Sequence, residues 1–426
     1  MKKNNWYRLD NSGMIYPMVI TQNTQSLYRV GVKLAEEVDP NFLRVALNTA
    51  LERYPYFRVE LKHGFFRHYL DENVRTPLVE EDDGVLLKIL NFRQNRYFLF
   101  RLTYFGKRIF LDFFHGLSDG NGAMEFLKTI LYYYFKAKND PIPRGDVKTL
   151  STPEKKEEVE DAFRRYYAKT SFKKGLKKMA SGFAFQVRGK QFAYEGFGLI
   201  QGLVDTDRLL AAARSYKCSI TVYLAALALL SVAKARGESK QREDFVAFIP
   251  VNLRKKFPSG TMLNFTNFAK CSVPRHCGLR LEEFVSFVKN ALKEQLREEE
   301  LRLKISFTSL MDSSKLLRYT PLFIKSFFSR VGRDLSTKTK QTMIISNLGS
   351  VKIDAGDRID HFLFNLNVSE RTPVNLAIVS YNNKTAISFT RKIIDTDIEK
   401  EFFSTLSKEV GEVEVISNFR EDNDVL

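Results

Sequence analysis

The chain has 426 residues, of which 44% are hydrophobic and 27% are charged. A single hydrophobic core stops growing at about 250–300 residues, so this length predicts two lobes. The composition is that of an ordinary globular protein, which excludes a disordered chain, a collagen-like repeat and a small disulfide scaffold. Its 67 basic and 50 acidic residues leave a net charge of +17, which favours anionic partners such as nucleic acid, phosphorylated cofactors or membrane surfaces.

Neither the start of the sequence nor its longest apolar run indicates a membrane-spanning or secreted protein. The run at 220–233 includes Thr221 and Ser231 and is shorter than the ~20 residues of a bilayer span. Residues 1–20 are polar where a secretory signal needs an apolar stretch, so we expect a cytoplasmic protein. The chain has three cysteines, Cys218, Cys271 and Cys277. They form neither an even framework nor a CxxC pair, so we expect no disulfide and no metal site.

The first part of the chain predicts strands that alternate with helices. After a strand at 28–34, Asp39 is the expected N-cap of a helix that begins at Pro40 and stops at Pro55. Branched and aromatic residues then predict four strand regions, at 58–70, 85–90, 96–104 and 108–114. A polar, glycine-rich turn at 115–122 follows, and an apolar stripe predicts a helix from about 123 to 136.

A basic stretch separates this part from the rest. Residues 164–190 contain nine basic residues and no acidic one, and prolines precede them. We therefore predict a first lobe at 1–150, a basic linker at 151–190 and a second lobe at 191–426. Three roles stay open for the stretch: a solvated linker, a contact for an anionic ligand, or a peripheral membrane contact. A membrane contact would use an amphipathic helix with several lysines on its polar side. Its apolar face would consist of Phe172, Leu176, Met179 and Phe183.

The second part repeats the mixture of helix and strand signals, so the predicted fold class is α+β. Its expected helices are at 205–216, with Asp205 as the cap, and at 221–236, 281–303, 321–332 and 397–410. Its expected strands are at 245–251, 342–346, 362–368, 374–381 and 385–390. Asn382 and Asn383 form the expected turn between the last two strands.

The turn after the strand at 108–114 is where chemistry is expected. His115 ends a buried strand and can act as a general base near neutral pH. The helix that follows points backbone N–H groups at a developing oxyanion. We assign Asp119 a structural role, in which it pairs with an arginine, and Gly120 allows an approach that a Cβ would obstruct.

The pattern His-x-x-x-Asp-Gly between a strand and a helix resembles the active-site motif of the chloramphenicol-acetyltransferase-like acyltransferases, a superfamily that includes condensation domains. The resemblance spans nearly the whole chain and is closest to the alcohol acetyltransferases. It extends to 64–70, 249–254, 260–267 and 346–349. It implies two similar lobes around a central tunnel, catalytic roles for His115, Asp119 and Gly120, and pairing of Asp119 with Arg254. The substrate-binding residues that it implies are Arg254, Ser346, Asn347 and Gly349, with Asn347 near the oxyanion.

The function that this resemblance implies is transfer of an acyl group, acetyl in the closest branch, from acyl-CoA to an alcohol hydroxyl. His115 would be the general base, without a covalent intermediate, a metal or a bound cofactor. Acyl-CoA is the expected cosubstrate, and the acceptor is a small or lipid-like molecule. Two alternatives stay open: amide or ester formation on a carrier-bound substrate, and a noncatalytic paralogue that binds a lipid or polyphosphate.

Two departures from the superfamily's patterns bear on these alternatives. Phe114 stands where condensation domains usually carry a second histidine, which argues against amide formation on a carrier. The plant-type Asp-Phe-Gly-Trp-Gly segment is missing, and the sole tryptophan is Trp6. The sequence shows no nucleic-acid-binding motif, so nucleic acid is not an expected partner. The sequence gives no prediction of the oligomeric state.

Overall fold

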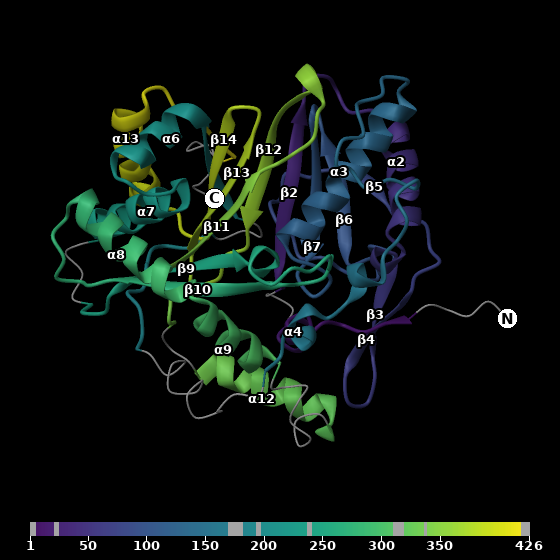
Figure 1. The fold of residues 1–426 in the computed structure, drawn as a ribbon, viewed down its shortest axis with the longest axis horizontal. Helices are drawn as coiled ribbons and strands as arrows, with labels where there is room; N and C mark the ends of the chain where they lie inside the picture. The colour runs from purple at the N-terminus through teal and green to yellow at the C-terminus, as the bar shows by residue number, and fades with distance from the viewer. Residues whose placement is uncertain are drawn as a thin grey trace.

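The structure is a computed structural model that describes residues 6–20, 25–168, 182–192, 197–236, 241–309, 319–335 and 339–418, with the backbone alone at 330–335. Within these residues the strands form three sheets of five, three and seven strands. Two large hydrophobic cores, one on each side of the molecule, confirm the predicted α+β fold with two lobes. Figure 1 shows the second lobe at the left and the first at the right.

The first lobe is built on the five-stranded sheet, in the order β12-β2-β7-β6-β5. These strands are β12 (Ile359–Leu366), β2 (Leu27–Leu34), β7 (Arg108–Phe114), β6 (Phe100–Phe105) and β5 (Val79–Glu81). A small sheet lies beside it, in the order β1 (Trp6–Tyr7), β4 (His68–Glu72) and β3 (Val59–His63). The helices of this lobe are α1 (Ile15–Met18), α2 (Pro40–Arg53) and α3 (Gly120–Ala137), and Asp39 caps α2 as predicted.

The second lobe is built on the seven-stranded sheet, in the order β10-β9-β11-β13-β14-β8-β15. These strands are β10 (Thr266–Val273), β9 (Phe245–Asn252), β11 (Met343–Ser350), β13 (Val374–Tyr381), β14 (Lys384–Arg391), β8 (Gly198–Asp205) and β15 (Glu414–Ser417). The helices are α6 (Thr206–Ser215), α7 (Ile220–Arg236), α8 (Leu281–Gln295), α9 (Glu298–Thr308), α12 (Leu322–Leu335) and α13 (Asp397–Val410). Asp205 caps α6 as predicted, and both turn asparagines between β13 and β14 have positive φ.

One strand crosses between the lobes. β12 lies late in the chain, within the predicted second lobe, but it pairs antiparallel with β2 of the first lobe from Leu366–Tyr28 to Ile359–Leu34. Figure 1 shows these two strands side by side where the lobes meet. The five-stranded sheet therefore contains a strand from beyond the predicted lobe boundary. Such pairing is possible because β2 offers an open sheet edge to which the chain returns late in the sequence. The boundaries at 150 and 190 themselves stay a prediction.

Part of the predicted linker is packed into the body of the protein. The short helices η2 (Lys156–Val159) and α4 (Ala162–Arg165) lie within it. Glu158 is buried and pairs with Arg53 of α2 at 2.7 Å, and Phe163 packs edge-on against Phe265 of the second lobe. This segment therefore straps the two lobes together. The predicted apolar helix face at 172–183 lies outside the described residues except for Phe183.

Several element predictions were wrong in detail. The apolar run at 85–90 forms no strand, because Leu87 has a φ of 53° and the run fills the core as a loop, while the strand of this region is β5. The helix predicted at 281–303 is two helices, α8 and α9, which break around Leu296. The strand region predicted at 58–70 is a hairpin of two strands, β3 and β4. The strands β1, β8, β10 and β15 and the short helix α1 were not predicted. The remaining predicted elements are present with shifts of a few residues at their ends.

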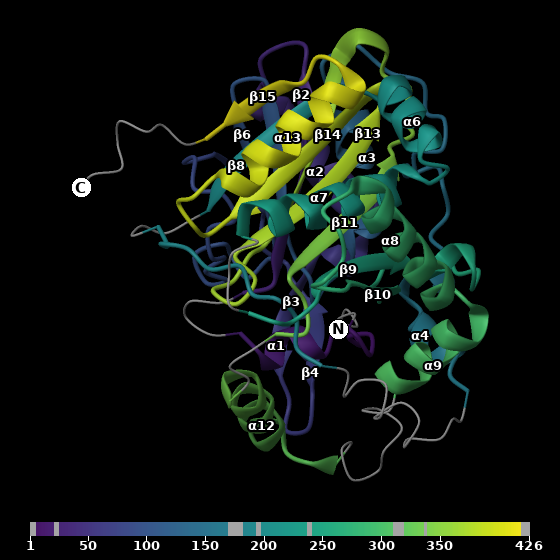
Figure 2. The same ribbon diagram turned by 90° about the vertical axis from the view of Figure 1, so that its left-hand side faces the viewer.

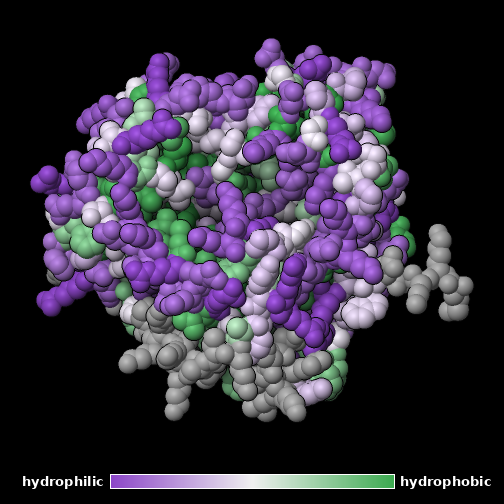
Figure 3. All heavy atoms as spheres, viewed as in Figure 1, coloured by the Kyte–Doolittle hydropathy of each residue, from purple (hydrophilic) through white to green (hydrophobic). Residues whose placement is uncertain are grey.

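Within the described residues, no single helix is long and apolar enough to cross a bilayer; α6 and α7 reach the required length only together, across a bend of 77°. Helix α7 is apolar on all sides because other elements of the second lobe surround it. The view in Figure 2 shows α6, α7, α8 and α13 layered over the strands of this lobe. On the face in Figure 3, hydrophilic residues cover most of the surface and hydrophobic residues show mainly in its hollows.

Candidate active site

The His-x-x-x-Asp-Gly motif connects the end of a central strand to the start of a buried helix. β7 ends at Phe114, the backbone N–H of His115 donates to the Ser26 carbonyl at 2.9 Å, and α3 begins at Gly120. The prediction that this helix starts near residue 123 was wrong, because Asp119 is its N-cap and accepts a hydrogen bond from the Gly122 N–H at 3.2 Å. The motif is therefore the N-terminal cap of a helix, where N–H groups point outward.

A cavity of about 320 Å³ lies at the motif and is lined by residues of both lobes. Of the predicted site residues, five line this cavity: His115, Asp119, Gly120, Ser346 and Asn347. The other two, Arg254 and Gly349, lie outside its lining. The junction of the lobes thus holds a chamber next to His115, and the tunnel that the resemblance implies stays a prediction.

The His115 imidazole is enclosed by aromatic rings. Tyr16 of α1 stacks on it with centroids 4.6 Å apart and planes 13° apart, and Tyr28 of β2 meets it edge-on at 5.0 Å. Burial lowers the pKa of His115, and the charge of Asp119 and the hydrogen bond with Asn264 offset this only in part. His115 is therefore neutral at pH 7, which is the form that accepts a proton.

A buried asparagine and aspartate determine which nitrogen of His115 carries its proton. His115 Nδ1 is 3.0 Å from Asn264 Oδ1. Asn264 donates both its backbone N–H and its Nδ2 to Asp10 Oδ2, at 3.2 and 3.0 Å, and the Gly13 N–H donates to Asp10 Oδ1 at 2.7 Å. Because the amide nitrogen of Asn264 faces the carboxylate, its oxygen faces His115 and accepts from Nδ1–H. The Nε2 lone pair is left as the basic site.

Asp119 is saturated with donors and acts as a structural anchor. Its carboxylate accepts from the Phe265 N–H and the Thr266 hydroxyl, both at 2.9 Å, in addition to the Gly122 N–H. The predicted pair with Arg254 is confirmed, with Nη1 2.8 Å from Oδ2 and Nη2 3.2 Å from Oδ1. Burial raises the pKa of Asp119, but Arg254 and the other donors outweigh it and hold the pKa below its usual value. Asp119 is thus ionised, and its hydrogen bonds and ion pair link the first lobe to the second.

Arg254 lies behind the motif. Besides Asp119, its guanidinium donates to the Thr261 carbonyl at 3.0 Å and to the Leu263 carbonyl at 2.6 Å. These bonds shape the loop between β9 and β10 that carries Asn264. The structure therefore places Arg254 as a support for the motif and for Asn264, away from the cavity lining where the sequence predicted substrate binding.

The segment at 346–349 forms the opposite wall. Asn347 Nδ2 donates to the Thr221 hydroxyl at 3.0 Å, and its Oδ1 accepts from the Gly349 N–H at 2.7 Å. Gly349 has a φ of 78°, at the point where the pairing of β11 with β13 shifts register. Leu348 lies against Gly120, where an added Cβ would be 2.7 Å from its Cδ2. The segment thus meets the motif across the junction of the lobes.

Sequence reasoning did not single out Asp10, Tyr16 or Asn264. Asp10 and Tyr16 lie on the N-terminal segment before β2, and Asn264 lies within 260–267, which carried the resemblance without an assigned role. The polar turn Asp10-Asn11-Ser12-Gly13 is the only local signal, and it is common to many turns. Their proximity to His115 arises from contacts across 99 to 254 positions of the chain, which a local pattern cannot reveal.

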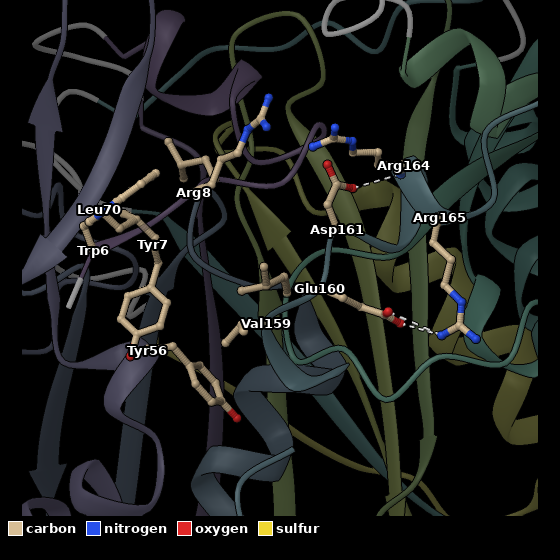
Figure 4. Close-up of a pocket in the computed structure, with 12 residues that line it drawn as sticks. Trp6, Tyr7, Arg8, Tyr56, Leu70, Val159, Glu160, Asp161, Arg164 and Arg165 are labelled. Atoms are coloured by element: carbon tan, nitrogen blue, oxygen red, sulfur yellow. Dashed lines mark hydrogen bonds and ion pairs between the residues drawn. The ribbon is translucent and has the colours of Figure 1, made fainter. Parts of the chain in front are cut away.

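A second cavity, of about 490 Å³, is lined in part by residues 6–9 of the N-terminal segment and shares no lining residue with the His115 cavity. Figure 4 shows Tyr7 and Tyr56 on one side of it and the ion pair of Glu160 with Arg165 on the other, at 2.9 Å. Asp161 accepts a hydrogen bond from the Asn11 N–H at 3.1 Å. This cavity contains no motif residue, so the chemistry is assigned to the other one.

The described residues include no group of three His, Cys, Asp or Glu side chains placed to hold a metal ion. The prediction of no metal and no bound cofactor stays a prediction.

No protein-family model and no curated protein matches this sequence. Solved structures match it over nearly their full length. Polyketide synthase associated protein 5 from Mycobacterium tuberculosis is 14% identical, with 95% of this chain and 97% of that chain covered and a TM-score of 0.63. Trichothecene 15-O-acetyltransferase from Fusarium sporotrichioides is 10% identical, with 96% and 95% covered and a TM-score of 0.60.

A third similar structure is the starter condensation domain of rhizomide synthetase in complex with C8-CoA. It is 11% identical, with 96% of this chain and 95% of that chain covered and a TM-score of 0.58. The chain thus has the fold that condensation domains share with chloramphenicol-acetyltransferase-like acyltransferases, as the resemblance implied.

Proposed function

We propose that the protein is an acyltransferase that moves an acyl group from acyl-CoA to the hydroxyl of an alcohol. The observation that carries this proposal is the state of His115: it is neutral, its Nδ1–H is held by Asn264, and it lines a cavity at the junction of the two lobes. A base prepared in this way suits removal of a proton from an acceptor. The shared fold with acyltransferases supports the same reaction class.

In the proposed reaction, Nε2 of His115 takes the proton of the acceptor hydroxyl as its oxygen attacks the thioester carbonyl. The tetrahedral intermediate then collapses, the carbon–sulfur bond breaks, and the departing thiolate takes the proton back from the imidazolium. His115 ends neutral and no acyl-enzyme forms. Gly120 and Asn121, at the N-terminus of α3, line the cavity and would place N–H groups near the oxyanion.

Asn347 also lines the cavity, and one N–H of its amide is held by Thr221. Its second N–H remains as the contribution to oxyanion binding that the resemblance implied. Because the other end of this amide accepts from Gly349, the side chain is held in one orientation, which favours such a role.

A second candidate is amide or ester formation on a carrier-bound substrate. Condensation domains among the similar structures favour it, one of them with a substrate analogue bound. Phe114 in place of a second histidine argues against it. We therefore rank transfer from acyl-CoA to an alcohol first.

The test is release of free thiol from a series of acyl-CoAs in the presence of alcohols, amines or no acceptor. We expect release that depends on an alcohol and that falls about 10²- to 10⁴-fold in His115→Ala. The matched control is His276→Ala, at an exposed histidine, which should keep wild-type turnover. Release in His115→Ala within a few-fold of wild type would remove His115 from the mechanism. Release with amines alone would favour the second candidate.

A further inference from the structure

Six aromatic side chains are exposed together at one end of the molecule, and we call them the aromatic surface. They come from the turn between β3 and β4 and from the segment that carries α12, and each is between 39% and 69% exposed: Phe65, Phe66, Tyr319, Phe323, Phe327 and Phe328. Figure 1 and Figure 2 both show α12 beside the end of the β3–β4 hairpin. A clustered apolar patch of this kind marks an interaction surface.

Hydrogen bonds join the two segments of the aromatic surface. The Leu322 N–H donates to the Phe65 carbonyl at 2.8 Å, and Lys325 Nζ donates to the Phe66 carbonyl at 3.0 Å. The rings of Phe66 and Tyr319 meet edge-on at 6.1 Å. The hairpin and helix therefore present one continuous surface.

The chemistry around the aromatic surface identifies its partner. Residues 61–70 and 319–329 contain no Asp or Glu, and their basic residues are Lys62, Arg67 and Lys325, of which Lys62 pairs with Glu60 at 2.9 Å. Phe323 and Phe327 are one helical turn apart and both exposed. Exposed phenylalanines next to Lys and Arg are typical of segments that lie in the interface of an anionic bilayer.

We propose that the aromatic surface docks the protein on the surface of an anionic lipid bilayer. The basic residues would approach the lipid phosphates, and the phenylalanines would enter the boundary between headgroups and acyl chains. The net charge of +17 adds a long-range attraction to the same surface. This proposal does not depend on acyl transfer.

The position of the aromatic surface relates it to the candidate site. α12 packs against α1, and Tyr16 of α1 stacks on His115. A bilayer on the aromatic surface would therefore lie on the side of the molecule from which α1 approaches the cavity. A lipid-like acceptor fits this arrangement.

The test is co-sedimentation of the full chain with vesicles of phosphatidylcholine that contain phosphatidylglycerol, and with vesicles of phosphatidylcholine alone. We expect binding to the anionic vesicles that weakens with salt, and weaker binding to the neutral ones. Replacing three exposed phenylalanines, Phe323→Ser, Phe327→Ser and Phe328→Ser, should lower affinity for anionic vesicles about tenfold or more. The hairpin variant Phe65→Ser with Phe66→Ser should lower it as well.

Two matched controls replace exposed phenylalanines elsewhere: Phe287→Ser on α8, at 40% exposure, and Phe105→Ser on β6, at 53%. Both should bind vesicles like wild type. Circular dichroism and the fluorescence of Trp6 check that each variant is folded. The proposal is overturned if wild type does not bind anionic vesicles, or if the triple variant binds as well as wild type. Self-association that the triple variant abolishes, without vesicle binding, would also overturn it, since a second copy would then be the partner.

Discussion

At His115, the direction of the pKa shift sets the pH range in which the base acts. Burial lowers the pKa of His115 below its usual value, so the neutral base predominates at pH 7 and is lost as the pH falls through the lowered value. We therefore expect the acid limb of kcat/KM to lie at a lower pH than the titration of an ordinary histidine. The measurement is a pH profile of thiol release with a saturating alcohol, and an acid limb centred above pH 7 would contradict the assignment.

A neighbouring carboxyl adds a control for this profile. Burial and the charge of Asp161 together raise the pKa of Asp10 to about 7, although hydrogen bonds from Asn264 and Gly13 oppose the shift. The acid limb should persist in Asp10→Asn if it belongs to His115, because within the described part of the chain Asp10 is connected to the imidazole through Asn264.

Asn264 is a positioning residue, and its removal should slow chemistry more than it weakens binding. Asn264→Ala leaves the buried Nδ1–H without an acceptor, so the tautomer with Nε2 as the base is no longer favoured. We expect kcat to fall about 10²-fold with little change in the KM for acyl-CoA. The matched control is Asn121→Ala, at a cavity asparagine that makes no hydrogen bond to His115 among the described residues. Equal losses in the two variants would mean that Asn264 only shapes the cavity.

Asp119 should matter for stability as well as for rate. Asp119→Ala removes the partner of a mostly buried guanidinium, which typically costs about 3–5 kcal/mol. It also removes the N-cap of α3, worth about 1 kcal/mol. Chemical denaturation gives the change, and Asp140→Ala is the control, since its pair with Arg358 is exposed and should contribute little. Unchanged stability and normal turnover in Asp119→Ala would refute its anchoring role.

Among the elements, α3 depends on a glycine that contacts both lobes. A Cβ on Gly122 would lie 2.0 Å from Ser118 Oγ and 2.4 Å from the Met262 carbonyl oxygen. Gly122→Ala should therefore destabilise the protein by about 1–3 kcal/mol, although alanine usually stabilises a helix. Gly260→Ala is the matched control, because its Cβ would meet only Glu157 Cβ at 3.5 Å. Equal denaturation midpoints for the two variants would show that the lobes move apart at this contact and accommodate the added Cβ.

Element positions were predictable from the sequence where local signals were strong. Asp39 with Pro40, and Asp205, placed the starts of two helices because an N-cap is a local interaction. The start of α3 was missed because Gly120 and Gly122 are poor helix formers, and tertiary contacts of Asp119 make up for them. Pairing of β12 with β2 was beyond prediction, since it joins residues more than 300 positions apart. For the same reason the motif pointed to His115 while Asn264 and Asp10 stayed hidden.

At the scale of the whole molecule, the two lobes are held together by strand β12, by the pair of Asp119 with Arg254 and by the strap at 156–165. The candidate site lies at this junction, so its geometry depends on all three. Contacts between the two lobes thus position the general base, His115. The resemblance supplied the pairing of Asp119 with Arg254 in advance, but only the folded chain shows that the same arginine also shapes the loop of Asn264.

The net charge of the whole molecule predicts how salt affects the proposed reaction. A field of +17 attracts the phosphates of acyl-CoA, and salt screens that attraction because the Debye length falls from about 10 Å at 0.1 M to about 3 Å at 1 M. The KM for acyl-CoA should therefore rise with ionic strength, while kcat, set by buried groups around His115, should change little. The matched control is a thioester of the same acyl group on N-acetylcysteamine, which has no phosphate. Its KM should not follow the salt concentration, and equal salt dependence for both thioesters would show that the charge does not serve the donor.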